Sequence, residues 1–189
     1  PKQLFSAASS SEIRLHKLGE IRWVYLGLEP SAAWPMTIEF LENNNLGLDS
    51  FDPNSGTINS KIFNFNNIDS KFVFKIERGL QQSSSEIFVS QLKKVNNSWE
   101  IVSSKENKLD SLINEFYEYL SSSGPATGTS LVALNLNASD KTEVITDEVS
   151  GLSKIKLRIN FARAWAALRR SLLLAGYKII DEDRNEGKF

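Results

Sequence analysis

The sequence lacks cysteine altogether, and it has one histidine and one methionine among its 189 residues. The absence of cysteine excludes a disulfide framework, a thiolate zinc site and a cysteine nucleophile. Because His16 stands alone, a metal site made from several histidines is excluded as well. A chain of this length buries roughly 70% of the surface that its unfolded form exposes, so it can fold without a disulfide or a metal.

An excess of charge of one sign is also missing, since 22 Lys and Arg residues face 23 Asp and Glu residues. Domains that bind nucleic acid usually carry a strong basic excess, so we do not expect nucleic acid to be the main partner. Long hydrophobic runs are absent too. With no stretch of about 18 apolar residues, the sequence predicts no membrane-spanning helix.

Motifs of catalysis and of cofactor binding are not found. There is no glycine-rich phosphate loop and no dinucleotide fingerprint. Residues 52–56 resemble a calcium loop, but the glutamate that such a loop needs further on is missing, so we predict a hairpin turn. The acidic runs at 147–148 and 181–183 flank predicted strands, and no nucleophile motif accompanies His16. We therefore expect a protein that is not an enzyme and that holds no metal or cofactor.

Two stretches of small and polar residues divide the chain. Residues 1–11 predict a linker or a disordered arm. Residues 123–130 have the composition of a flexible linker, and Gly124 and Pro125 end the helix before it. We accordingly predict a first domain at 12–122 and the start of a second domain at 131–189.

The first domain alternates between strand and helix periods. Residues 21–26 predict a strand with Ile21, Trp23 and Tyr25 on its inner face, and Pro30 opens a helix with an apolar stripe. Further strands are predicted at 46–51, 57–65, 71–77 and 86–95. A closing helix carries its apolar stripe at Leu109, Leu112, Ile113, Phe116 and Leu120. This order predicts an α+β fold, in which helices cover one face of an antiparallel sheet.

The second domain begins in a similar way. Short strands are predicted at 131–136 and 142–149, and residues 154–159 alternate with their isoleucines and leucine facing inward. A helix follows with Phe161 and Trp165 on its apolar stripe. Gly176 caps this helix, and residues 177–180 predict another strand.

An internal repeat relates the two halves at a constant offset of 131 residues. Trp34 matches Trp165, and the Asp-x-Asn-x-Gly turn ending at Gly56 matches the one ending at Gly187. A period this long indicates duplicated domains rather than a solenoid. The first copy continues for more than 60 residues after Gly56, so we expect the second copy to be truncated. We expect its exposed helix face and strand edge to pack on another copy of the chain or on the first domain.

Three segments together resemble the BamC (NlpB) lipoproteins of Gram-negative bacteria. They are residues 33–56, the Glu-Arg-Gly and Ser-Glu-Ile-Phe-Val-Ser segments at 77–79 and 85–90, and residues 161–187. No single motif is specific, and the resemblance depends on their order and on the duplication.

The resemblance implies two helix-grip domains, in which an antiparallel sheet curls around a long C-terminal helix. It also implies a non-enzymatic accessory scaffold of the outer-membrane β-barrel assembly machinery, which acts in the periplasm by protein–protein interaction with a BamD-like subunit. The protein would be held at the outer membrane by a lipid on an N-terminal cysteine. This sequence departs from that pattern, since it has no cysteine and only about ten residues of a possible N-terminal arm.

The candidate binding residues are a basic stripe, Arg163, Arg169 and Arg170, and one tryptophan, Trp99. Arginine and tryptophan are enriched in protein interfaces, and arginine binds carboxylates in a forked geometry. A solvated helix face is the alternative for the arginines, and core packing is the alternative for the tryptophan. A second function remains open, because a helix-grip sheet can enclose a lipid or another small apolar ligand. The residues that would line or fill such a cavity are Phe72, Phe74, Phe88 and Phe116.

Overall fold

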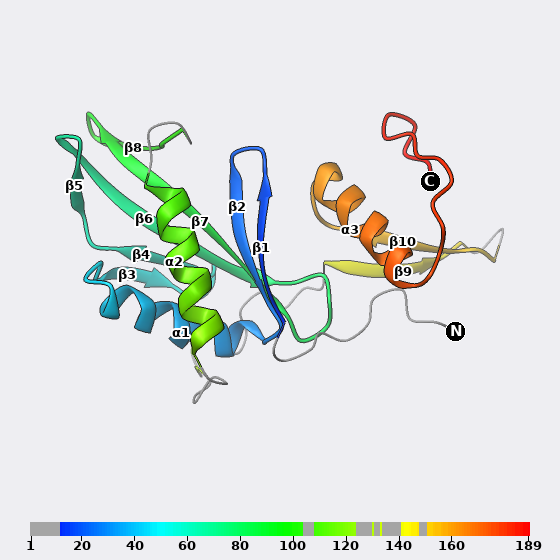
Figure 1. Ribbon diagram of the computed structural model, residues 1–189, viewed down its shortest axis with the longest axis horizontal. Coiled ribbons are helices and arrows are strands. Elements are labelled where there is room, and N and C mark those ends of the chain that lie inside the picture. Colours follow the sequence, from blue (N-terminus) through cyan, green and yellow to red (C-terminus); the bar gives the residue numbers. More distant parts are fainter. Residues whose placement is uncertain (1–11, 104–107, 124–129, 131–132, 134–140, 148–150) are drawn as a thin grey trace. The chain divides into compact units, whose positions relative to one another are not determined.

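The computed structural model describes residues 12–103, 108–123, 130, 133, 141–147 and 151–189 (Figure 1). They fall into two compact units. The larger unit contains nearly all described residues up to 133, and the smaller one contains residues 141–189. The predicted arm at 1–11 and most of the predicted linker at 123–130 lie outside the described residues, as does most of the predicted strand at 131–136.

The larger unit is built on an eight-stranded antiparallel sheet. Its central path runs in the order β1-β2-β7-β6-β4-β3, while β5 pairs with β6 and β8 pairs with β7. The strands are β1 (Ile13–Leu18), β2 (Ile21–Leu26), β3 (Leu48–Asp52), β4 (Thr57–Ser60), β5 (Phe63–Phe65), β6 (Ile68–Arg78), β7 (Ser85–Val95) and β8 (Ser98–Ile101). The two longest strands, β6 and β7, pair over nine residues at the centre of the sheet.

Two helices, α1 (Pro30–Asn43) and α2 (Leu109–Ser122), contribute to one hydrophobic core with the sheet (Figure 1). The predicted apolar stripe of α2 is confirmed, because all five of its residues are buried. The α+β class that the sequence predicts is therefore correct.

Three phenylalanines from three different elements meet at the centre of this core. Phe40 of α1 lies 4.8 Å from Phe116 of α2 and 6.2 Å from Phe74 of β6, between ring centroids. Phe74 and Phe116 are 5.4 Å apart with an edge-to-face geometry, and none of the three rings is exposed. Phe72 is buried beside them. These phenylalanines fill the space between sheet and helices, and Phe88 alternates away from the core side of β7.

A proline inside α1 ties a later segment to this helix. Pro35 has no N–H, so the carbonyl of Ser31 has no partner one turn further on. The N–H of Ser130 donates to that carbonyl at 2.9 Å. Close by in sequence, Ala133 is buried in the core of the larger unit.

The predicted inner face of β2 is wrong. Val24 and Leu26 belong to the core, whereas Ile21 is 40% exposed and Trp23 lies on the opposite face of the strand. Trp23 is nevertheless buried, because it stacks on His16 of β1 and on Phe88 of β7. The strand alternates as predicted, but its smaller aliphatic side chains, Val24 and Leu26, face the core.

The predicted strand at 57–65 is also wrong in its extent, because it divides into β4 and β5. Lys61 turns away between them, and its N–H donates to the carbonyls of Leu46 and Gly47 at 3.2 and 3.0 Å. These bonds hold the backbone of Lys61 beside the segment that follows α1. The pairing of β4 with β6 ends before this point, at Asn59. Two strands, β1 and β8, were not predicted.

The smaller unit has an antiparallel hairpin, β9 (Thr142–Thr146) and β10 (Ser153–Leu157), followed by α3 (Phe161–Leu174). The hairpin and the helix agree with prediction. The inward burial expected along 154–159 is wrong at Ile155, which is 45% exposed, whereas Leu157 and Ile159 are half-buried between exposed basic residues. The strand predicted at 177–180 is wrong as well. Among the described residues no strand pairs with this segment, and only a bridge between Asp183 and Lys188 forms further on.

Candidate interaction surface

The helices that the sequence repeat relates have matching limits. Trp34 in α1 and Trp165 in α3 stand 131 residues apart, and both helices begin and end at positions related by that offset. Their N-caps also match, with φ and ψ of −60° and 152° at Glu29 and of −64° and 152° at Asn160. The correspondence therefore extends from residue types to backbone conformation.

The C-terminal ends of the two helices match too. Asn45 and Gly176 occupy equivalent positions, and both have positive φ, at 56° and 82°. The residue after each of them donates its N–H back into the last turn: Leu46 to the Leu41 carbonyl and Tyr177 to the Leu172 carbonyl, both at 3.0 Å. Positive φ followed by such a bond is the common way to end a helix.

The Asp-x-Asn-x-Gly motif forms the same turn twice. The Asp52 carboxylate accepts the N–H of Asn54 at 3.0 Å, and the Asp183 carboxylate accepts the N–H of Asn185 at 2.9 Å. Gly56 and Gly187 both have positive φ, at 73° and 68°, which explains the glycine at this position. In the first turn, the Ser55 hydroxyl and the Asn54 N–H lower the pKa of Asp52.

The strands that precede the two helices differ in their pairing. By the same offset, β10 corresponds to β2. The strand β2 pairs with β1 on one side and with β7 on the other, whereas β10 pairs only with β9 among the described residues. The outer edge of β10 is equivalent to the edge that β7 covers in the larger unit, and an open edge is a site where another chain can pair.

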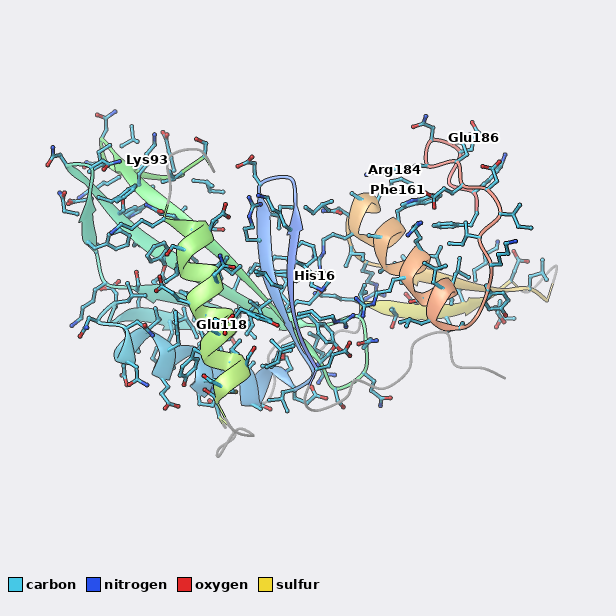
Figure 2. All side chains as sticks on the ribbon, in the orientation of Figure 1. His16, Lys93, Glu118, Phe161, Arg184 and Glu186 are labelled. Atoms are coloured by element: carbon cyan, nitrogen blue, oxygen red, sulfur yellow. The ribbon has the colours of Figure 1, made fainter. Side chains whose placement is uncertain are left out.

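Burial differs in the same way between the two helices. Trp34 is 3% exposed in the core, but no residue of α3 is buried. Phe161, at the start of α3, is 56% exposed (Figure 2), and Leu174 at its end is 67% exposed. Trp165 stacks on Phe189 at 3.9 Å between centroids and stays half-buried. An open apolar helix face thus lies in the same unit as an open strand edge.

The three predicted arginines lie on α3. Arg169 pairs with Glu182 at 2.9 Å in an exposed salt bridge, and Arg170 is exposed. Arg163 is half-buried near the N-terminal end of the helix. The structure therefore brings this basic stripe and the open helix face together on one element.

Trp99, the other predicted contact residue, lies on the edge strand β8 in the larger unit. Its ring is half-buried, and the ammonium group of Lys71 lies 4.7 Å from the ring centroid. Trp99 and the arginine stripe belong to different units, so they are two separate candidate binding sites.

The Glu-Arg-Gly and Ser-Glu-Ile-Phe-Val-Ser segments form the two ends of the central hairpin, where Arg78 pairs with Ser85. Gly79 follows, and a Cβ atom at this position would collide with the Ser84 side chain. The Ser85 hydroxyl donates to the Leu28 carbonyl at 2.5 Å and so connects the hairpin to the start of α1. These motif residues have structural roles.

Within the described residues, no group of three or more His, Asp or Glu side chains is placed to hold a metal ion. The same residues include no helix that is both long and apolar enough to cross a membrane. A comparison with protein-family models finds no match, and no curated protein matches the chain.

Proposed function

We propose that this chain is a non-enzymatic scaffold of the BamC type, which acts in outer-membrane β-barrel assembly through protein–protein contacts. In this proposal both units are helix-grip domains, and the smaller unit carries the opening elements of a second copy. The protein would work at the periplasmic side of the outer membrane, held by a lipid anchor, with a BamD-like subunit as its partner.

The observation that carries the proposal is the matched pair of β2–α1 and β10–α3. The two segments share limits, caps and the Asp-x-Asn-x-Gly turn, yet within the part of the chain that the structure describes only the first has its strand edge and its helix face covered. A strand edge and an apolar helix face bind other polypeptides by established modes, namely strand addition and helix-to-groove packing. The strand edge and helix face that are covered in β2–α1 are open in β10–α3, and this supports a role in binding another protein.

The charge on this unit favours an acidic partner. Arg163 and Arg170 lie on α3, and β10 adds Lys156, whereas Lys154 of the same strand is paired with Asp147 at 2.8 Å. Two copies of β10 paired with each other would bring lysines close together, and like charges in opposite positions destabilise a sheet. We therefore favour a different acidic protein over self-association through this edge.

The test is calorimetric titration of the purified chain with a purified BamD-like subunit. We expect saturable binding that weakens as the salt concentration rises, because exposed charges are screened. A variant with Arg163→Glu, Arg169→Glu and Arg170→Glu should bind at least about tenfold more weakly, which corresponds to about 1.4 kcal/mol.

A charge-reversal control carries Lys93→Glu (Figure 2) and Lys94→Glu at two adjacent lysines of β7, which belong to the larger unit and not to the unit that contains α3. This control should bind as the wild type does. The proposal is refuted if the wild type does not bind the subunit, or if both charge-reversal variants lose affinity to the same extent.

A further inference from the structure

One edge of the central strand β7 is shared by two partners that leave a gap between them. Along this edge, β2 pairs with residues 85–89 and β8 pairs with residues 92–95. Ser90 and Gln91 lie between the two paired stretches. At this gap there is a pocket of about 290 Å³, which the first residue of α2 also lines. Its walls include Ile21, Arg22, Gln91, Ile101, Val102 and Leu109.

The Gln91 amide is the unusual group in this pocket. Its side chain is 1% exposed, and its Oε1 accepts the backbone N–H of Lys108 at 2.8 Å. In the side-chain amide only the oxygen can accept a hydrogen bond, so this bond fixes the orientation of the amide. The Nε2 group at the other end has no hydrogen-bond partner among the residues that the structure describes. Buried donors are paired in most proteins, so a donor with no partner among the described residues calls for a further acceptor.

The charges around the pocket are already balanced. Arg22 is 4% exposed, and its Nε donates to the Asp110 carboxylate at 2.8 Å. Its Nη1 donates to the Gly19 carbonyl at 2.5 Å. Glu20 lines the pocket as well. Since the cation is already paired and a carboxylate lies nearby, a ligand with a negative charge gains little here, and a neutral acceptor fits better.

The other residues that line the pocket favour an apolar ligand. Ile21, Val102 and Leu109 give an apolar surface, which gains from contact with hydrocarbon. A water molecule takes up roughly 30 Å³ of liquid, so the pocket has room for more than one bridging water. It lies at the lower end of the size range of ligand pockets, which suits a molecule with a single ring.

We propose that this pocket binds a small, neutral, mostly apolar molecule whose carbonyl oxygen accepts a hydrogen bond from Nε2 of Gln91. The described residues that line this pocket all belong to the larger unit, so the proposal does not depend on the proposed role of the smaller one. It also differs from a cavity between the sheet and the helices, where Phe40, Phe74 and Phe116 pack against one another.

The test uses two aromatic probes of similar size on the intact chain. Acetophenone carries a carbonyl oxygen, and isopropylbenzene replaces it with a methyl group. Each is titrated while the side-chain amide protons of Gln91 are followed by NMR. We expect acetophenone to shift these protons saturably and downfield, as hydrogen bonding does, and to bind about tenfold more tightly than isopropylbenzene. Equal affinity for the two probes, or no saturable shift with acetophenone, would overturn the proposal.

Two variants locate the effect. Gln91→Met removes the donor at nearly constant volume and should lower the acetophenone affinity about tenfold while leaving that of isopropylbenzene unchanged. Where this variant does not fold, Gln91→Glu keeps an acceptor for the Lys108 N–H and, when ionised, replaces the donor by an acceptor. Ile62→Phe, at an exposed isoleucine that does not line the pocket, is the control and should bind both probes as the wild type does. Unchanged acetophenone affinity in both Gln91 variants would contradict the proposal.

Discussion

The two matched tryptophans give the sharpest prediction about stability. Trp34 and Trp165 occupy equivalent positions in α1 and α3, but only Trp34 is sealed in a core, where it is 3% exposed. Truncation of a buried tryptophan to alanine costs about 3–5 kcal/mol, because apolar contact is lost and a cavity remains. Trp165 instead contacts the rings of Phe189 and Phe161, and an aromatic pair contributes about 0.5–1.5 kcal/mol. We therefore expect Trp34→Ala to be several times more costly than Trp165→Ala.

Urea unfolding followed by far-ultraviolet circular dichroism measures both effects. At a denaturant slope of about 2 kcal/mol/M, a loss of about 4 kcal/mol moves the midpoint of the larger unit by roughly 2 M. The Trp165→Ala change should move its own transition by about 0.5 M. Hydrogen exchange read by mass spectrometry then shows which unit has lost protection. Equal losses for the two variants would refute the conclusion that the face of α3 is open.

Three more predictions concern the larger unit. Gly79→Ala should cost more than about 1 kcal/mol in thermal unfolding, because the new methyl group collides with Ser84. A cost near zero would contradict this packing. Asp110→Ala should lower the free energy of unfolding by about 2 kcal/mol, because it leaves the buried charge of Arg22 without its partner. Arg22→Met should lower it by less, and the reverse order in urea unfolding would be evidence against this account. An NMR titration should give Asp52 a pKa below its ordinary value. The contribution of this carboxylate to stability is then present at neutral pH and is lost as the pH falls through the lowered pKa. An unshifted pKa would show that the turn does not form.

Much of the fold could be predicted wherever a local pattern decides the structure. The stripe of α2 follows the helical period, and its burial agrees with prediction from Leu109 to Leu120. The turns ending at Gly56 and Gly187 could be predicted because a positive φ demands a particular residue. These features depend on neighbours in sequence.

The parts that sequence did not predict depend on distant contacts. The core side of β2 is decided by α1 and α2, and local alternation does not contain that information. A strand at 177–180 has suitable residues but needs a neighbour to pair with. The pocket beside Gln91 is made by β2, β7, β8 and α2 together, so no spacing along the chain could have revealed it.

The meeting of three phenylalanines also bears on how a chain with two similar helices avoids misfolding. Exchange of equivalent elements is a known failure of proteins with repeated units. The position of Phe40 in α1 corresponds to Ser171 in α3. If α3 took the place of α1 on the larger sheet, a small hydroxyl side chain would stand where a ring closes the core, and the resulting hole would cost several kcal/mol, about as much as a Phe→Ala change. The phenylalanine cluster therefore favours α1 over α3 at this place on the sheet, because only α1 fills the core.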